Sequence, residues 1–175
     1  MSVSDRGGSK TVAILGVGVM GSTLLAGLIR SGRAAADLVI TGRNVERAGE
    51  LAETYGVPLM SNVDAAAGAD TLVLVVKPQD MDGLLAEISD HVRPGALVVS
   101  LAAGITTGFL AERLPEGTPV VQVMPTRPAR VDEAMARTSP RRHAAVGRCG
   151  GSGAHPAPGA PYGVIVWFVA STLEM

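Results

Sequence analysis

A glycine pattern near the start of the chain could bind a phosphate group. The apolar run Val12–Leu15 leads directly into Gly16-Val17-Gly18-Val19-Met20-Gly21, and apolar residues then recur at helical spacing as far as Arg30. In G-x-G-x-x-G between a strand and a helix, the glycines allow a tight turn, a close approach of a pyrophosphate and close helix packing. The helix N-terminus also attracts anions. We expect Gly16 to Gly21 to bind a dinucleotide; the alternative is a purely structural glycine turn in another α/β fold.

The residues after the second apolar run indicate which dinucleotide is bound. NAD sites carry Asp or Glu about 20 residues past the glycines, where it holds the ribose 2′-hydroxyl. This chain has Thr41-Gly42-Arg43-Asn44 in that place. A guanidinium beside hydroxyl and amide groups suits a 2′-phosphate, so NADP is favoured and NAD is the alternative. Asn44 is also expected to cap the next helix, and the alternative role for Arg43 is a solvated side chain.

Two later loops are expected at the same edge of a sheet. They are Val75-Val76-Lys77-Pro78-Gln79-Asp80 and Ser100-Leu101-Ala102-Ala103-Gly104-Ile105-Thr106. Ligands of open α/β sheets bind at the carboxyl ends of strands, and small residues there leave room for a nicotinamide ring. Lys77 is either a charged donor or a solvent-facing residue. Ser100 and Thr106 are expected to be strand-end and cap hydroxyls rather than catalytic groups.

The elements that position these loops follow a regular alternation. Segments with helical spacing, including one expected to begin after an Asp80 N-cap, separate six short runs rich in β-branched residues. Such runs predict a Rossmann-type, doubly wound parallel sheet with helices on both sides, in the α/β class. The six predicted strands are Val12–Leu15, Leu38–Thr41, Val57–Met60, Thr71–Val76, Ala96–Leu101 and Pro119–Val123.

Composition narrows the class of protein. The chain has 175 residues, a net charge of -1 and one cysteine, Cys149, which cannot form an intramolecular disulfide. This favours one full domain in a reducing cytoplasm. The sequence has no signal-peptide pattern and no apolar run of the about 18–20 residues that span a bilayer. We therefore expect no membrane partner. The histidines His91, His143 and His155 share no metal-ligand spacing, and no aromatic and basic residues interleave to bind nucleic acid.

The regular pattern is confined to part of the chain. We expect a flexible N-terminus over residues 1–10, an NADP-binding domain over 11–125, a linker remnant over 126–140 and a poorly structured, Gly/Pro-rich tail over 141–175. Within the tail, Val164–Ala170 is expected either to add a strand or to be aggregation-prone. The change in composition suggests a truncated or frame-shifted end, and the alternative is a native short variant with a flexible tail.

Four motifs together resemble a known family. Gly16–Gly21, Val76-Lys77-Pro78-Gln79, Ser100–Thr106 and Val123-Met124-Pro125, in this order and at these intervals, are similar to the N-terminal domain of pyrroline-5-carboxylate reductase. The resemblance covers roughly residues 10–140. It implies NAD(P)H-dependent reduction of the small molecule 1-pyrroline-5-carboxylate to proline, the last step of proline biosynthesis.

The resemblance also implies roles for individual residues. It assigns no proton donor, so the catalytic residues are unknown. Its implied cofactor and substrate residues are Gly16, Val17, Gly18, Val19, Met20 and Gly21 at the pyrophosphate; Thr41, Arg43 and Asn44 at the 2′-phosphate; Val76, Lys77, Pro78, Ala102, Ala103 and Gly104 at the nicotinamide; and Met124 and Pro125 at the substrate pocket.

The similarity weakens after the last predicted strand. Thr126 stands where the family pattern has Asn, Arg127 follows it, and no match is seen after about Ala145. The family's helical C-terminal domain, which forms the homo-oligomer and carries a Ser/Thr-rich substrate site, is therefore not seen. Two alternatives stay open. One is another NADP-linked reductase of the 6-phosphogluconate or hydroxyacid dehydrogenase type, against which Lys77–Gln79 and Ala102–Thr106 argue. The other is a non-catalytic NADP-binding module.

Overall fold

The two apolar runs nearest the N-terminus form strands with the predicted bounds, β1 (Val12–Leu15) and β2 (Leu38–Thr41). A computed structural model describes residues 10–125 and 136–140. Three more predicted runs form β3 (Thr71–Leu74), β4 (Leu97–Ser100) and β5 (Val120–Pro125). Four of these five strands are buried along all or nearly all of their length, as expected for a sheet covered on both faces.

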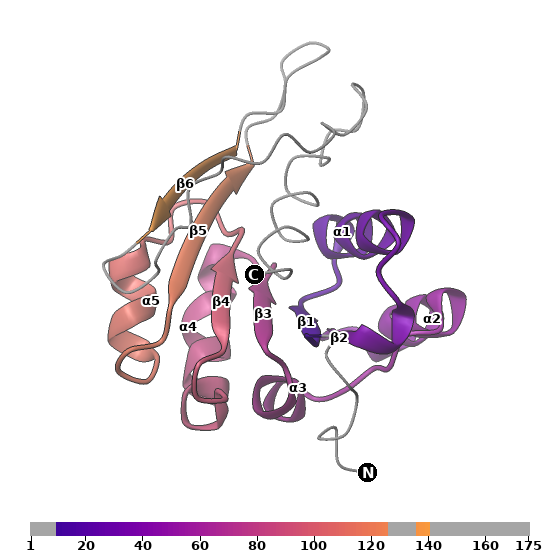
Figure 1. Cartoon of the computed structure of the whole chain (residues 1–175), viewed down its shortest axis with the longest axis horizontal. Coiled ribbons are helices and arrows are strands. Elements are labelled where there is room, and N and C mark those ends of the chain that lie inside the picture. Colours follow the sequence, from indigo (N-terminus) through magenta and orange to yellow (C-terminus); the bar gives the residue numbers. More distant parts are fainter. Residues whose placement is uncertain (1–9, 126–135, 141–175) are drawn as a thin grey trace.

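The strands assemble in the order β2-β1-β3-β4-β5-β6 (Figure 1). The first five are parallel, and β6 (Ala136–Pro140) runs antiparallel to β5. Leu15 at the end of β1 lies opposite Thr41 on one side and Leu74 on the other. The carboxyl ends of these strands therefore meet at one edge, with the reversal of strand order at β1. Open α/β sheets bind ligands at such a point, and the predicted doubly wound class is confirmed.

Helices cover both faces of the sheet because side chains alternate along each strand. On one face, Val12 and Ile14 pack with α1 (Val19–Arg30) and α2 (Val45–Tyr55). On the other, Ala13 and Leu15 pack with α3 (Asn62–Gly68), α4 (Pro78–Ile88) and α5 (Thr107–Arg113). Two short 3₁₀ helices, η1 (Ala35–Asp37) and η2 (Ser89–His91), precede β2 and follow α4.

The predicted strand Val57–Met60 is wrong as a strand. Only a single parallel bridge joins Leu59 to Ile40 on the outer side of β2. Ile40 N–H donates to the Pro58 carbonyl and Met60 N–H to the Ile40 carbonyl, each at 3.0 Å. Pro58 has no N–H to extend a ladder, and Ser61 at once caps α3 by accepting from Asp64 N–H. The segment occupies the place of an outer strand but is too short to be one.

The predicted helix caps are confirmed in part. Asn44 caps α2 by accepting from Arg47 N–H at 3.1 Å, and Thr106 caps α5 by accepting from Phe109 N–H at 3.1 Å. The predicted Asp80 cap is wrong, since α4 begins at Pro78 after Lys77. Proline is favoured at the first helical position because its φ is preset and its missing N–H is not needed there. Asp80 therefore lies in the first turn, with its side chain free to face another partner.

Several predictions lie outside the described residues. These concern the N-terminus before Lys10, Thr126 and Arg127, Cys149, His143 and His155, and the tail with Val164–Ala170. Over the ranges 10–125 and 136–140, no helix has the length and apolar character to cross a bilayer. The same ranges contain no cluster of three or more His, Cys, Asp or Glu side chains that could hold a metal ion.

Candidate functional site

The fold itself requires two of the three glycines in the loop after β1. Gly16 has a φ of +102°, and a Cβ there would lie 2.9 Å from Val76 Cγ1 and 3.0 Å from the Val75 carbonyl oxygen. At Gly21 a Cβ would lie 2.3 Å from the Gly16 carbonyl oxygen. Real Cβ atoms essentially never approach backbone as closely as 2.3 Å, and at Gly16 the positive φ disfavours a side chain in addition to the crowding. These two positions would be glycine in this loop even without any ligand.

Gly18, the N-cap residue of α1, is different because no described atom crowds it. It precedes α1 with a φ of -73° and a ψ of -159°, which any residue can adopt. A Cβ there would have no described atom within 4 Å. The first turn of α1 also carries no acidic residue, and no side chain caps it. Open space therefore adjoins a positive helix end, and a pyrophosphate fits that combination of features.

The other residues of the loop divide between core and solvent. Val17 is 6% exposed and belongs to the core beneath α1, and Met20 packs against the same core. Val19 is 72% exposed. The side chains of Val17 and Met20 thus hold the loop on the sheet, which leaves the loop's backbone for any phosphate.

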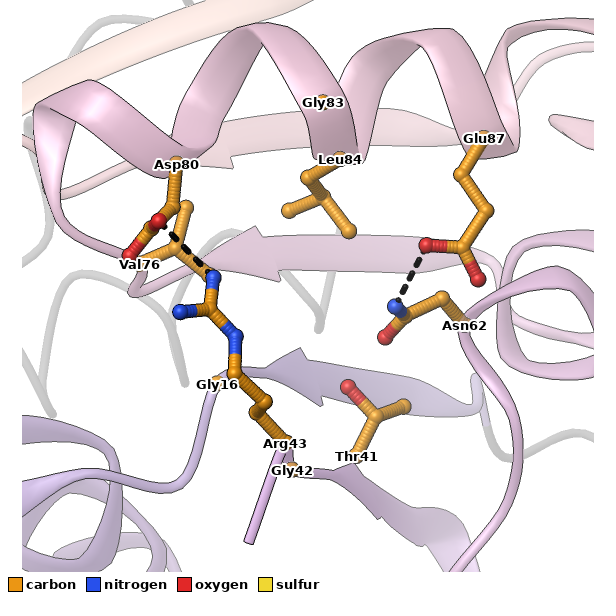
Figure 2. Close-up of a pocket in the computed structure, with 10 residues that line it drawn as sticks. All are labelled: Gly16, Thr41, Gly42, Arg43, Asn62, Val76, Asp80, Gly83, Leu84 and Glu87. Carbon is orange, nitrogen blue, oxygen red and sulfur yellow. Dashed lines mark hydrogen bonds and ion pairs between the residues drawn. The ribbon is translucent and has the colours of Figure 1, made fainter.

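Beside this loop lies a cavity of about 310 Å³, between the carboxyl ends of the strands and α4 (Figure 2). Its walls come from three strand ends, the start of α3 and one face of α4. The lining residues are Gly16, Thr41, Gly42, Arg43, Asn62, Val76, Asp80, Gly83, Leu84 and Glu87. Of the sequence-predicted cofactor residues, it brings together Gly16, Thr41, Arg43 and Val76.

Backbone hydrogen bonds join the glycine loop to the end of β2. The Thr41 carbonyl accepts from Gly16 N–H at 3.1 Å and from Val17 N–H at 3.0 Å. At Gly42 a Cβ would lie 3.0 Å from both Ala48 Cβ and Val17 Cγ2. The two loops predicted to hold the pyrophosphate and the 2′-phosphate are thus fixed to each other.

Arg43 reaches across the mouth of the cavity to α4. Its Nη2 lies 2.8 Å from Asp80 Oδ1, and its side chain is 81% exposed, against 26% for Asp80 (Figure 2). The hydrogen bond to Asp80, followed by the charge of that carboxylate, raises the pKa of Arg43. A permanently charged, accessible guanidinium therefore stands beside the cavity.

The sequence reasoning did not identify three polar residues of the cavity as site residues: Asn62, Asp80 and Glu87. Asn62 Nδ2 donates to Glu87 Oε2 at 2.9 Å, so α3 and α4 are joined along the far wall. Asp80 and Glu87 lie on the same face of α4, two helical turns apart. The sequence alone shows this spacing, but it does not show that this side of α4 faces Arg43.

The loops predicted to flank the nicotinamide lie at the same edge of the sheet but contribute little to the cavity. Lys77 and Pro78 are exposed, Ala102 is buried, and Ala103 and Gly104 are exposed. Leu74 pairs with Ser100, so the two loops leave neighbouring strands side by side. Ser100 is buried, and its hydroxyl accepts from Ala102 N–H at 3.3 Å, which makes it a strand-end group as predicted. The predicted substrate residues Met124 and Pro125 end β5, paired with Arg137 and Ala136 of β6.

The parallel sheet, its reversal at β1 and the strand–glycine–helix junction define a Rossmann-type domain. Residues 11–104 match the family described as "NADP oxidoreductase coenzyme F420-dependent". The chain belongs to this family of oxidoreductases.

Individual relatives confirm the predicted resemblance. The chain is 38% identical over 130 residues to the pyrroline-5-carboxylate reductase of Mycobacterium tuberculosis, an alignment covering 71% of this chain and 44% of that protein. It is 36% identical over 137 residues to the corresponding protein of Corynebacterium melassecola, covering 76% and 51%. The solved pyrroline-5-carboxylate reductase of Coxiella burnetii superposes with a TM-score of 0.71 at 27% identity, covering 78% and 51%. The chain thus spans about half the length of these relatives.

Proposed function

We propose that this chain binds NADPH and uses it to reduce 1-pyrroline-5-carboxylate to L-proline. The observation that carries the cofactor half of the proposal is Gly18. Gly16 and Gly21 are needed by the fold, but Gly18 faces open space beside the α1 N-terminus. A cofactor pyrophosphate that approaches the backbone explains the absence of a side chain there.

The choice of NADPH rests on the opposite wall of the site. The end of β2 carries Arg43 and no carboxylate, and the guanidinium lies at the cavity mouth. Arginine binds a phosphate through charge-assisted hydrogen bonds. The family description, which names NADP, supports the same choice. Thr41 and Asn44 complete this subsite, and Asn44 can cap α2 with its carbonyl oxygen while its amide faces outward.

The nicotinamide end of the cofactor is assigned to the loops after β3 and β4. A dinucleotide with its pyrophosphate at Gly18 and its adenosine beside Arg43 extends its other half over β3 and β4. Val76 to Pro78 and Ala102 to Gly104 then border the ring, with Met124 and Pro125 beyond them on β5.

No residue of this site is assigned as a proton donor. When bound, NADPH would supply a hydride to the ring C=N carbon, which is a better acceptor when the imine nitrogen is protonated. The residues named above orient the ring and border the space next to it, and this orientation is the protein's main contribution. The substrate itself is assigned on the names of the relatives, of whose length the chain spans about half.

Two assays on the purified 175-residue chain test the proposal. Fluorescence titration should give saturable NADPH binding, and 1-pyrroline-5-carboxylate should cause NADPH oxidation, whereas 6-phosphogluconate and 3-hydroxyisobutyrate should not reduce NADP⁺. Binding without turnover would replace the reductase by a non-catalytic NADP-binding module. Absence of NADPH binding would contradict the proposal as a whole.

A further inference from the structure

The cavity contains a carboxylate close to the end of β2, although the residues directly after β2 include none. Dinucleotide sites that prefer NAD carry an acidic residue at the end of the second strand, and this chain has Arg43 instead. Asp80 comes to the same corner from the first turn of α4, with Oδ1 2.8 Å from Arg43 Nη2 (Figure 2). The cavity therefore holds both an arginine and a carboxylate where the cofactor's ribose substituent is expected.

We infer that Asp80 determines cofactor specificity by pairing with Arg43 and thereby lowering the preference of the site for NADPH over NADH. This inference rests on the proposed function, because it concerns the same cofactor site. Asp80 acts on the cofactor through its charge and through Arg43, and it takes no part in hydride transfer.

The first step is a competition for one guanidinium. Carboxylates and phosphates bind the same planar set of N–H donors on arginine, so a 2′-phosphate must share Arg43 with Asp80 or displace it. The exchange is accessible because the Arg43 side chain is 81% exposed and exposed ion pairs contribute little stability. NADH has a hydroxyl at this position and leaves the Arg43–Asp80 pair in place.

The second step is repulsion between the phosphate and the carboxylate. The backbone of Asp80 is fixed at the start of α4, because its N–H donates to the Lys77 carbonyl at 2.9 Å, so side-chain rotation alone can move the carboxylate. Its side chain is only 26% exposed, so water screens it less than it screens Arg43. A phosphate on Arg43 would therefore stay close to a negative charge. A ribose hydroxyl, in contrast, can donate to a carboxylate, as it does at the acidic residue of NAD sites.

Two other carboxylates of α4 provide matched controls. Asp82 forms a similar ion pair, with Arg113 Nε at 2.6 Å from its Oδ1, but does not line the cavity. Glu87 lines the cavity but accepts from Asn62 rather than from Arg43. D82N thus removes a carboxylate paired with an arginine from the same helix, and E87Q removes a carboxylate bonded to an amide from the same cavity.

The experiment measures the dissociation constants of NADPH and NADH by fluorescence titration for the wild type, D80N, D82N and E87Q. D80N should tighten NADPH binding by about tenfold and leave NADH binding unchanged or weaker. D82N should change neither constant by more than about twofold. E87Q should change the NADPH-to-NADH ratio less than D80N does. The D80N effect should shrink at high salt and in an R43A background, since it depends on exposed charges and on Arg43.

Three other outcomes would contradict the inference, and each can be distinguished from the others. If the wild type binds both cofactors but D80N leaves their ratio unchanged, or E87Q shifts it equally, Asp80 is not a specificity determinant while the proposed function stands. If thermal unfolding shows that D80N is folded yet NADPH binding weakens, the sign of the inference is wrong. If the wild type binds neither cofactor, the proposed function fails and the inference fails with it.

Discussion

The carbonyl oxygen of Gly16 lies 2.3 Å from the point where a side chain at Gly21 would begin. The first turn of α1 is therefore packed directly on the loop that leads into it. Gly16 in turn lies against Val75 and Val76 after β3. The glycine loop, α1 and the β3 loop form one close-packed unit, and this contact fixes the α1 N-terminus beside the cavity.

Replacing Gly21 by alanine should destabilise the fold. The new Cβ meets backbone oxygen, which cannot move without shifting the loop, and overpacking of this kind costs about 1–3 kcal/mol or more. We expect G21A to lower the melting temperature measured by circular dichroism, or to abolish soluble expression. A G21A protein as stable as the wild type would show that α1 is not seated on Gly16 as described.

Replacing Arg43 by alanine should affect NADPH selectively. Loss of a charge-assisted bond to the 2′-phosphate should weaken NADPH binding by about tenfold or more and NADH binding by less than about threefold. Arg47 is a suitable control, because it is exposed on α2 and does not line the cavity. Equal losses for both cofactors in R43A, or equal effects of R43A and R47A on NADPH, would contradict the role given to Arg43.

Replacing Asn44 by alanine tests the cap of α2. Its side chain accepts from Arg47 N–H at 3.1 Å, and loss of such a cap costs about 0.5–2 kcal/mol. Chemical denaturation should show this loss for N44A and near-wild-type stability for N44S, because serine also caps helices. Equal stability of N44A and the wild type would mean that the cap contributes nothing to the fold.

Sequence patterns predicted the strands because the burial of a strand on both faces shows in its own residues. A run buried on both faces, such as Val12–Leu15, is apolar throughout, so its presence and bounds were readable. Val57–Met60 is also apolar throughout, yet Pro58 and the Ser61 cap limit it to one bridge. Among the described strands, β6 (Ala136–Pro140) pairs with β5 alone, and it has no apolar pattern from which to predict it.

The candidate site was predictable only where a motif is continuous in the sequence. The glycine loop and Arg43 belong to short motifs with a known physical role. Asn62, Asp80 and Glu87 join the cavity because α3 and α4 pack over the sheet, and their contacts join residues far apart in the chain. From sequence alone, a polar side chain on a helix is expected to be exposed. What that side chain faces is known only once the packing of the helices on the sheet is known.

Replacing Asp70 by alanine should separate stability from cofactor binding. Asp70 accepts from Thr11 N–H at 2.9 Å and from Arg93 Nη1 at 2.7 Å, just before β3 begins. This is the amino end of the strands, opposite the cavity. D70A should lower the free energy of unfolding by about 1–3 kcal/mol, measured in urea, with the NADPH dissociation constant unchanged. A large loss of NADPH affinity in a folded D70A protein would contradict the placement of the site.

The most direct test of the cofactor site is NADPH titration of wild type, G18A and G49A. Both glycines leave open space for a Cβ, but Gly49 lies within α2, away from the cavity. G18A should remain folded, with a stability loss below about 1 kcal/mol, and bind NADPH about tenfold or more weakly. G49A should bind like the wild type and be slightly more stable, by up to about 1 kcal/mol. NADPH binding by G18A equal to that of G49A and the wild type would contradict a pyrophosphate site at Gly18.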